Sequence, residues 1–224
     1  MGTTIHRLRQ PRLGNGTADG CTGQAEKSAM THAAAEKIGE LFDILRIDHR
    51  DDHNTRDTPR RFARMLVEET LRGRYDAPPL ITDFDNVEAF DQLIVTGPIA
   101  LRSTCAHHLM PIYGNVFIGA LPSADGRIIG LSKYDRVVDH FAARLQIQEE
   151  LVKQIGQHLV DATAPRGLAV RISAVHMCRT HRGVRASQCG RMVNSAYYGE
   201  LAADRSLQGQ FLKECVALER GVAG

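Results

Sequence analysis

The pattern of apolar residues changes at Pro78-Pro79, and this change limits the fold more than any other feature of the chain. Before it, apolar side chains such as Ile38, Leu41 and Leu45 recur at spacings of three and four, which predicts helices. After it come short runs rich in β-branched residues, which predict strands. Helices followed by a set of strands favour an α+β fold.

The segment before Pro78 predicts two helices. The first runs from about Met30 to Leu45. The second begins at Asp57-Thr58-Pro59, where a capping residue precedes a proline of the first turn, and it reaches Gly73. Residues 1–28 show no apolar period and are rich in Gly, Thr, Arg and Gln. We therefore expect a flexible tail at 1–28 and a helical region at 29–76.

The remaining residues, 77–220, predict one domain with a sheet. Its strand-like runs are Gln92–Val95, Ile99–Arg102, Tyr113–Leu121, Arg127–Leu131 and Leu168–Met177. Ser123–Gly126 is typical of a hairpin turn between two of these runs. A long helical pattern extends from Lys133 to about Ala162 with a break near Leu145, and Leu207–Leu218 predicts a terminal helix.

Composition excludes several functional classes. The 28 basic and 26 acidic residues nearly balance, so we expect no nucleic-acid partner. No apolar run approaches the roughly 20 residues that span a bilayer, and the N-terminus lacks the apolar core of a signal peptide. The cysteines are five in number and widely spaced, which disfavours a disulfide framework. We expect a cytoplasmic protein that does not bind membranes.

Two short segments carry residues typical of a metal site. Cys105-Ala106-His107-His108 and His176-Met177-Cys178 each stand at the end of a strand-like run. A catalytic zinc takes three such sulfur and nitrogen ligands and keeps a fourth position for water, whose pKa falls to about 7. Spacing alone leaves the set open, as two cysteines and one of the histidines. If both segments are extended, His107 and His108 point apart, whereas His176 and Cys178 share a face.

Basic residues are scattered along the chain, and several of them flank these two segments. Arginine makes bidentate contacts with phosphate. They are Arg61, Arg64, Lys133, Arg136, Arg179, Arg182 and Arg185. A substrate with several negative charges, such as a triphosphate, needs several cations of this kind.

Five stretches, in their order and gaps, resemble the GTP cyclohydrolase I family over about residues 30–218. They are Thr58-Pro59-Arg60-Arg61, Ser103-Thr104-Cys105-Ala106-His107-His108, Ile129-Gly130-Leu131-Ser132-Lys133, Gln146-Ile147-Gln148-Glu149, and Val175-His176-Met177-Cys178 followed by Arg182-Gly183-Val184-Arg185. The resemblance implies a tunnelling fold, in which antiparallel sheets with two long helices per subunit close into an oligomeric barrel. The usual assembly of the family is a homodecamer of two pentamers, with active sites between subunits.

The resemblance also implies an activity. A zinc-dependent enzyme of this family hydrolyses GTP at C8 to formate and 7,8-dihydroneopterin triphosphate, the first step of tetrahydrofolate and pterin synthesis. By resemblance, Cys105, His108 and Cys178 hold zinc, and His107 and His176 transfer protons. Glu149 is expected as a buried carboxylate on the guanine edge. The implied substrate-binding residues are Arg61, Arg64, Ile129, Leu131, Ser132, Lys133, Arg136, Gln148, Glu149 and Arg182.

The chain departs from the family pattern at three places. Ala106 stands where the family usually has Glu, Arg64 stands where it has Lys, and the run 189–196 keeps only part of a threonine-rich pattern. These departures leave two alternatives open. One is a divergent paralogue that acts on GTP or another purine nucleotide in a specialised pterin or deazapurine pathway, or that performs only the first ring opening. The other is a catalytically idle pterin-binding regulator, which the intact cysteines and histidines disfavour.

Overall fold

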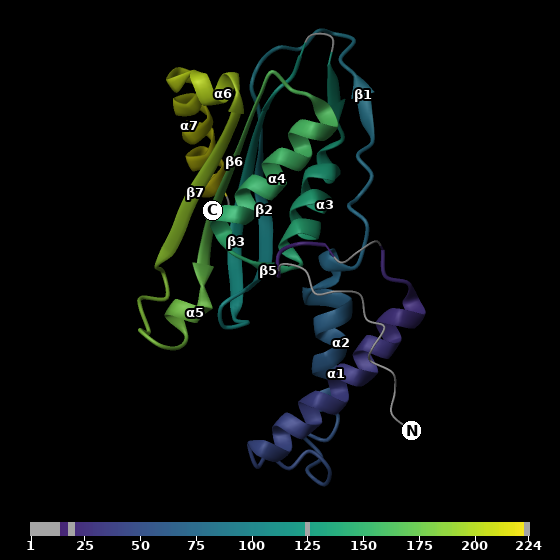
Figure 1. The fold of residues 1–224 in the computed structure, drawn as a ribbon. Helices are drawn as coiled ribbons and strands as arrows, with labels where there is room; N and C mark the ends of the chain where they lie inside the picture. The colour runs from purple at the N-terminus through teal and green to yellow at the C-terminus, as the bar shows by residue number, and fades with distance from the viewer. Residues whose placement is uncertain (1–13, 18–20, 124–125, 222–224) are drawn as a thin grey trace. The chain divides into compact units, whose positions relative to one another are not determined.

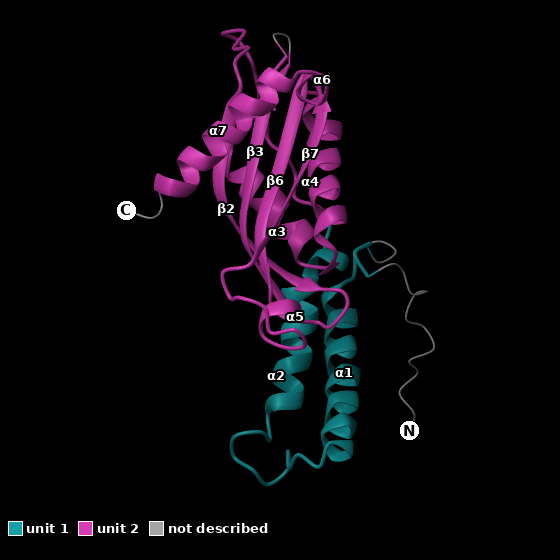
Figure 2. Ribbon diagram, turned by 90° about the vertical axis from the view of Figure 1, so that its left-hand side faces the viewer, with its two compact units in different colours: residues 1–77 teal, residues 78–224 magenta. Residues whose placement is uncertain are grey.

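The computed structural model describes residues 14–17, 21–123 and 126–221 of the chain. The chain forms two compact units, residues 1–77 and residues 78–224 (Figure 2). Much of the expected tail at 1–28 lies outside the described residues, but its last part is helical, because a helix begins at Gln24. Within the described ranges, no helix is long and apolar enough to cross a membrane.

The first unit consists of the two helices that the sequence predicts. Helix α1 spans Gln24–Ile44 and α2 spans Thr58–Arg64, with a proline in its first turn. The second helix continues as a π-helix at Met65–Thr70 and a 3₁₀-helix at Arg72–Arg74. An ion pair between Lys27 and Asp76 ties the start of α1 to the end of the unit.

The second unit is built on a five-stranded sheet. Its strands are β2 (Ile94–Cys105), β3 (Pro111–Leu121), β5 (Leu145–Gln146), β6 (Gly167–His176) and β7 (Arg191–Gly199), in the order β5-β2-β3-β6-β7. The short β5 runs parallel to β2, and the other neighbours are antiparallel. A separate antiparallel pair joins β1 (Asp83–Asp85) to β4 (Arg127–Ile129).

Three features of this sheet differ from the prediction. The runs Gln92–Val95 and Ile99–Arg102 belong to one strand, β2, which bends at an irregularity between Thr96 and Ile99. The expected hairpin is wrong, because β4 pairs with β1 and β3 pairs with β2 and β6. Two of the turn residues, 124 and 125, lie outside the described residues. Strands β1 and β7 had no counterpart in the prediction.

Helices cover both faces of the sheet. Helices α3 (Leu131–Ala142) and α4 (Gln148–Thr163) lie on one face, and α6 (Glu200–Ala203) and α7 (Arg205–Gly221) lie on the other (Figures 1 and 2). The predicted break near Leu145 is confirmed, since β5 separates α3 from α4. The predicted terminal helix is confirmed as α7.

The alternation of side chains along β3 explains the two cores. Val116 and Ile118 are fully buried in the cluster beneath α3 and α4. Phe117, between them, points to the opposite face and packs in the cluster that contains Phe211 of α7. Because successive residues of a strand face opposite sides, one strand supplies both cores. A strand buried on both faces reads as a continuous apolar run, as Val116–Ile118 does.

The register of the sheet determines where the site forms. Strand β3 is antiparallel to both β2 and β6, so β2 and β6 run in the same direction. Thr104 of β2 pairs with Pro111, and His176 of β6 pairs with Ile112. The two strands therefore end at the same edge of the sheet, one strand apart, rather than as immediate neighbours.

Candidate active site

Cys105 is the last residue of β2, and a tight loop follows it. Its backbone N–H donates to the Met110 carbonyl oxygen over 2.8 Å, and the Leu109 N–H donates to the Cys105 carbonyl oxygen over 3.0 Å. Residues 106–108 form a turn, so the alternation of faces expected for His107 and His108 does not apply. Both imidazoles are exposed, while the Cys105 side chain is buried.

The second cysteine approaches the first from the end of β6. His176 ends that strand, and Cys178 lies in the short helix α5 (Met177–Thr180). The segment is therefore not extended, and the prediction that His176 and Cys178 share a face of a strand does not apply. Burial and a hydrogen bond with the Cys105 thiol raise the pKa of the Cys178 thiol, and the Arg182 guanidinium opposes this rise. The two strand ends thus bring both sulfur atoms together. His107 Nδ1 lies 3.8 Å from the Cys105 sulfur.

The structure joins two of the three predicted metal ligands. Two thiols in contact are a donor set that suits zinc. Over residues 14–17, 21–123 and 126–221, however, no three His, Cys, Asp or Glu side chains converge closely enough to hold a metal ion. His108, the predicted third ligand, is an exposed residue of the turn after Cys105.

His176 is hydrogen-bonded to the start of α4. Its Nε2 atom lies 2.7 Å from Oε1 of Gln148, which is the first residue of α4 and only 1% exposed. Burial lowers the pKa of the His176 imidazole; the Glu149 carboxylate opposes this effect and the Arg179 guanidinium adds to it. A buried, hydrogen-bonded imidazole beside a thiol pair is a group that can exchange protons near neutral pH.

Asn194 of β7 belongs to the same cluster, and the sequence did not single it out as a site residue. Gln148 Nε2 donates to Asn194 Oδ1 over 2.8 Å and to the Met192 carbonyl oxygen over 3.2 Å. The one sequence feature that could have pointed to Asn194 was the departure of residues 189–196 from the family pattern. Because β7 itself was not predicted, nothing linked that departure to the site.

Glu149 follows Gln148 in the first turn of α4 and is exposed, not buried as expected. Consecutive helical residues project about 100° apart, so the buried orientation of Gln148 turns its neighbour outward. The Ala106 N–H donates to the Gln146 carbonyl oxygen over 3.0 Å, which holds the turn after Cys105 beside the segment that leads into α4. Glu149 therefore lies at the same edge of the sheet as His176.

A second group of predicted residues lies at the start of α3. Ile129 is buried in β4, Leu131 and Ser132 are exposed, and Lys133 is half-buried. The opposite end of α3 meets β2, because Ser103 Oγ donates to the Ala142 carbonyl oxygen over 2.7 Å. Ser132 precedes Ala142 by ten residues, or about 15 Å along a helix.

Within the second unit, the predicted substrate residues therefore fall into two separate groups. Arg136 is exposed and lies on α3 with the residues of that group. Arg182 lies near Cys178, because its guanidinium lowers the pKa of the Cys178 thiol. Arg61 and Arg64 are exposed on α2 in the first unit.

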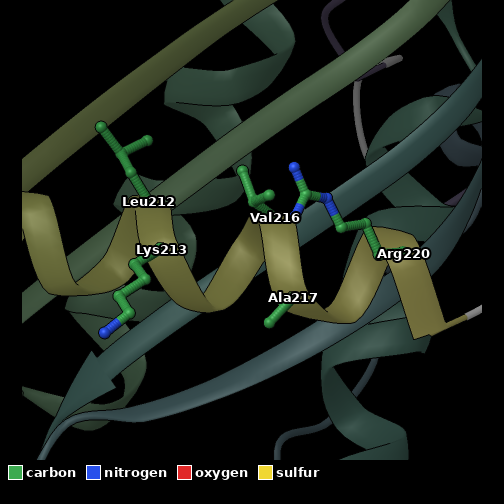
Figure 3. Close-up of a pocket in the computed structure, with 5 residues that line it drawn as sticks. All are labelled: Leu212, Lys213, Val216, Ala217 and Arg220. Atoms are coloured by element: carbon green, nitrogen blue, oxygen red, sulfur yellow. The ribbon is translucent and has the colours of Figure 1, made fainter.

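A surface groove on α7 is unrelated to these residues (Figure 3). It is lined by Leu212, Lys213, Val216, Ala217 and Arg220. These side chains include no cysteine and no histidine, so the groove lacks the ligand and proton-transfer groups found at the ends of β2 and β6.

Comparison with known proteins identifies the family. The family model described as GTP cyclohydrolase I matches residues 34–216. A GTP cyclohydrolase 1 of Mycobacterium avium is 39% identical over 173 residues, which cover 77% of this chain and 83% of the relative. Similar proteins of the same name come from Shewanella denitrificans (39% identity; 78% of this chain and 79% of the relative) and Coxiella burnetii (38% identity; 82% and 97%).

The chain therefore belongs to the GTP cyclohydrolase I family, and the resemblance found from its five motifs is confirmed. The expectation of an enzyme of this family is confirmed by the same matches. Among solved structures, the apo form of the archaeosine synthase QueF-Like is similar with a TM-score of 0.36 and 15% identity, over 49% of this chain and 94% of that one. That similarity is too low to support a statement about function.

Proposed function

We propose that the chain is a zinc-dependent GTP cyclohydrolase I, which hydrolyses GTP at C8 to formate and 7,8-dihydroneopterin triphosphate. The observation that carries the proposal is the meeting of the Cys105 and Cys178 thiols beside His176, in a chain of this family. The relatives of this chain carry the name GTP cyclohydrolase 1.

Zinc would be held by Cys105, Cys178 and His108. Two sulfur donors already in contact fit this metal, and the third ligand comes from the turn that directly follows Cys105. When bound, zinc acts as a Lewis acid and lowers the pKa of a water molecule to about 7.

Glu149 would select the base. Its carboxylate accepts hydrogen bonds from N1–H and the amino group of guanine. Adenine has no N1–H at this edge, so the carboxylate would lose a partner on desolvation, and this loss rejects the wrong purine. The position of Glu149 beside His176, whose pKa it influences, supports this role.

His176 and His107 would transfer protons. The lowered pKa of His176 leaves its ring mostly neutral at pH 7, so it can accept a proton during ring opening and return it to the leaving nitrogen. His107, exposed on the turn, would serve the later rearrangement of the ribose and ring closure. Each of these steps requires proton exchange near neutral pH.

The triphosphate and ribose would bind to the remaining basic and polar residues. Ser132, Lys133 and Arg136 lie on α3, roughly 9–15 Å along that helix from the end that meets β2. This separation supports a site completed by a second copy of the chain, as in a homodecamer of two pentamers. The implied binding set also contains Ile129, Leu131, Gln148, Arg182, Arg61 and Arg64.

Turnover of GTP with and without a chelator, followed by mass spectrometry of the product, tests the proposal. We expect formate and 7,8-dihydroneopterin triphosphate, loss of activity with the chelator, and recovery with zinc. If zinc-loaded protein leaves GTP unchanged, the proposal is wrong.

Ala106 favours one alternative that the same experiment decides. The family usually has a carboxylate at this position beside the metal segment, and its loss removes a group that can orient neighbouring ligands. A cyclohydrolase of this kind would stop after ring opening or prefer another purine nucleotide. A ring-opened product that accumulates without pterin would support this alternative.

A further inference from the structure

Three side chains form a continuous hydrogen-bonded chain from β7 through α4 to β6. Asn194 contacts Gln148 twice: its Oδ1 accepts from Gln148 Nε2 over 2.8 Å, and its Nδ2 donates to the Gln148 carbonyl oxygen over 3.3 Å. Gln148 Oε1 then lies 2.7 Å from His176 Nε2. The chain is shielded from solvent at its centre, because Gln148 is 1% exposed.

Main-chain carbonyl groups fix the orientation of the Gln148 amide. Its Nε2 end faces the carbonyl oxygens of Met192 at 3.2 Å and Ile172 at 3.4 Å. A carbonyl oxygen only accepts hydrogen bonds, so the amide end that faces these two groups must be the NH₂. The oxygen end of Gln148 therefore faces His176.

The orientation of Asn194 is fixed in the same way. The Gln148 carbonyl oxygen only accepts, so the end of Asn194 that faces it must be its NH₂ group. Its oxygen then faces Gln148 Nε2 and adds a third acceptor there. Both amides are thus held in one orientation by main-chain carbonyl oxygens, which can accept hydrogen bonds but cannot donate them.

This arrangement determines the tautomer of His176. An amide oxygen only accepts, so the neutral His176 ring must carry its proton on Nε2. The other ring nitrogen, Nδ1, then has the free lone pair that can accept a proton from a reacting group. If the Gln148 amide turned over, its NH₂ would favour the opposite tautomer and would leave Nδ1 protonated.

We propose that Asn194 is a positioning residue, which clamps Gln148 and thereby holds His176 as the Nε2–H tautomer with Nδ1 free. This gives Gln148 a positioning role in place of the substrate contact that the resemblance implied. It also gives a function to one position of the run 189–196, where the chain departs from its family. The catalytic consequence rests on the proposed function, because it requires His176 to transfer protons.

Nitrogen-15 NMR of zinc-loaded enzyme with labelled histidine tests the tautomer directly. At about pH 8 the ring is neutral, and the spectrum separates protonated from unprotonated ring nitrogens. The chain has ten histidines, so His176 is assigned by the signals that disappear in His176→Gln. We expect a single Nε2–H form in the unmodified enzyme and a mixture of both tautomers in Asn194→Ala.

Kinetics on GTP test the consequence. We expect Asn194→Ala to lower kcat about tenfold or more and to change KM less than twofold, since the clamp acts on proton transfer and not on substrate contacts. If Asn194 acts through Gln148, then Asn194→Ala adds no further loss in a Gln148→Leu background. Additive losses in the double variant would contradict the proposal.

Two further variants control for damage to the strand. Ser195→Ala changes the adjacent residue, whose side chain faces the other side of β7, and should keep both the tautomer and kcat. Asn194→Ser keeps a small polar side chain and serves as the test variant if Asn194→Ala folds poorly. It should show the same mixture of tautomers. An unchanged Nε2–H form in both Asn194 variants would overturn the inference, whether or not the enzyme acts on GTP. Absence of GTP turnover in the unmodified enzyme would instead overturn the proposed function.

Discussion

The thiol of Cys178, in helix α5, lies beside the thiol of Cys105, at the end of β2, and this neighbour helps to raise the pKa of the Cys178 thiol. The strands that carry them to this position are not neighbours, because β3 lies between β2 and β6. They meet because both strands run in the same direction and end at one edge of the sheet. Two thiols at one edge supply two of the sulfur donors that a zinc ion can take.

Replacing Cys178 by serine should remove the metal. A serine hydroxyl is a far poorer zinc ligand than a thiolate, so we expect zinc content to fall from near one ion per chain to near zero. GTP turnover should fall to less than about one hundredth. Zinc analysis of the purified protein and an assay of dihydroneopterin triphosphate measure both effects. Cys189→Ser is the matched control, because Cys189 is exposed and free, and it should retain zinc and activity. Full zinc content in Cys178→Ser would rule out this ligand set.

Replacing Glu149 by glutamine should weaken the recognition of guanine. A charge-assisted hydrogen bond contributes about 1.5–3 kcal/mol, so kcat/KM for GTP should fall roughly 10- to 100-fold. Discrimination against ATP should fall as well, because the amide offers both a donor and an acceptor. Steady-state kinetics with both nucleotides measure the change. Glu150→Gln alters the next exposed carboxylate of α4 and should have little effect. Equal losses in the two variants would indicate a general electrostatic effect.

Two glycines should respond in opposite directions to alanine. A Cβ at Gly114 in the central strand β3 would lie 2.1 Å from the Ser173 carbonyl oxygen and 2.6 Å from Ala174 Cα, both main-chain atoms of β6. We expect Gly114→Ala to lower the free energy of unfolding by about 1–3 kcal/mol, because β3 and β6 must move apart to admit the methyl group. Among the described residues, a Cβ at Gly209 in helix α7 would meet no atom within 4 Å beyond its chain neighbours and its own helix backbone, and Gly209→Ala should stabilise by about 0.5–1 kcal/mol. Chemical denaturation of both variants gives the comparison. A stable Gly114→Ala protein would contradict the close packing of β3 on β6.

His158 should make the fold sensitive to acid. Burial lowers the pKa of its imidazole, with Asp161 opposing this effect and Arg144 adding to it. Its Nε2 atom is buried without a hydrogen-bond partner in the described part of the chain. Between the lowered pKa and the unfolded value of about 6.5, the unfolded chain binds a proton that the folded chain does not. The free energy of unfolding should therefore decrease as the pH falls through this window.

A non-titrating side chain at this position tests that expectation. In His158→Gln, the decrease in the free energy of unfolding between about pH 7 and pH 5 should be smaller than in the unmodified protein. Denaturation curves over this range measure the slope for both proteins. Identical slopes would show that His158 does not contribute to the acid sensitivity.

The sequence predicted most of the long elements and missed β7 and the short β1. Both helices of the first unit, the break between α3 and α4, and the strands β3 and β6 followed from periodicity and capping residues. Strand β7 escaped prediction because its residues are mostly half-buried and mix polar with aromatic side chains. The expected hairpin failed because pairing of β4 with β1 depends on residues some forty positions away. Local turn propensity carries no information about such a partner.

The sequence likewise predicted the residue types of the site but not their geometry. The cysteines and histidines at the ends of β2 and β6 stood out by residue type and spacing. The faces predicted for their side chains hold only for extended segments, whereas a turn follows Cys105 and a helix follows His176. The expected burial of Glu149 did not appear in the chain, since Gln148 occupies the buried position of that helical turn.

The sequence by itself determined the family, the types of residue available for metal and proton chemistry, and the helices and strands whose periodic pattern is local. The tertiary structure alone decided that Cys105 meets Cys178 across an intervening strand, and that Gln148 orients His176 while Asn194 orients Gln148. The reason is physical: residue type and periodicity are properties of neighbours along the chain, whereas a hydrogen bond depends on the positions of atoms that only the packed sheet and helix bring within about 3 Å.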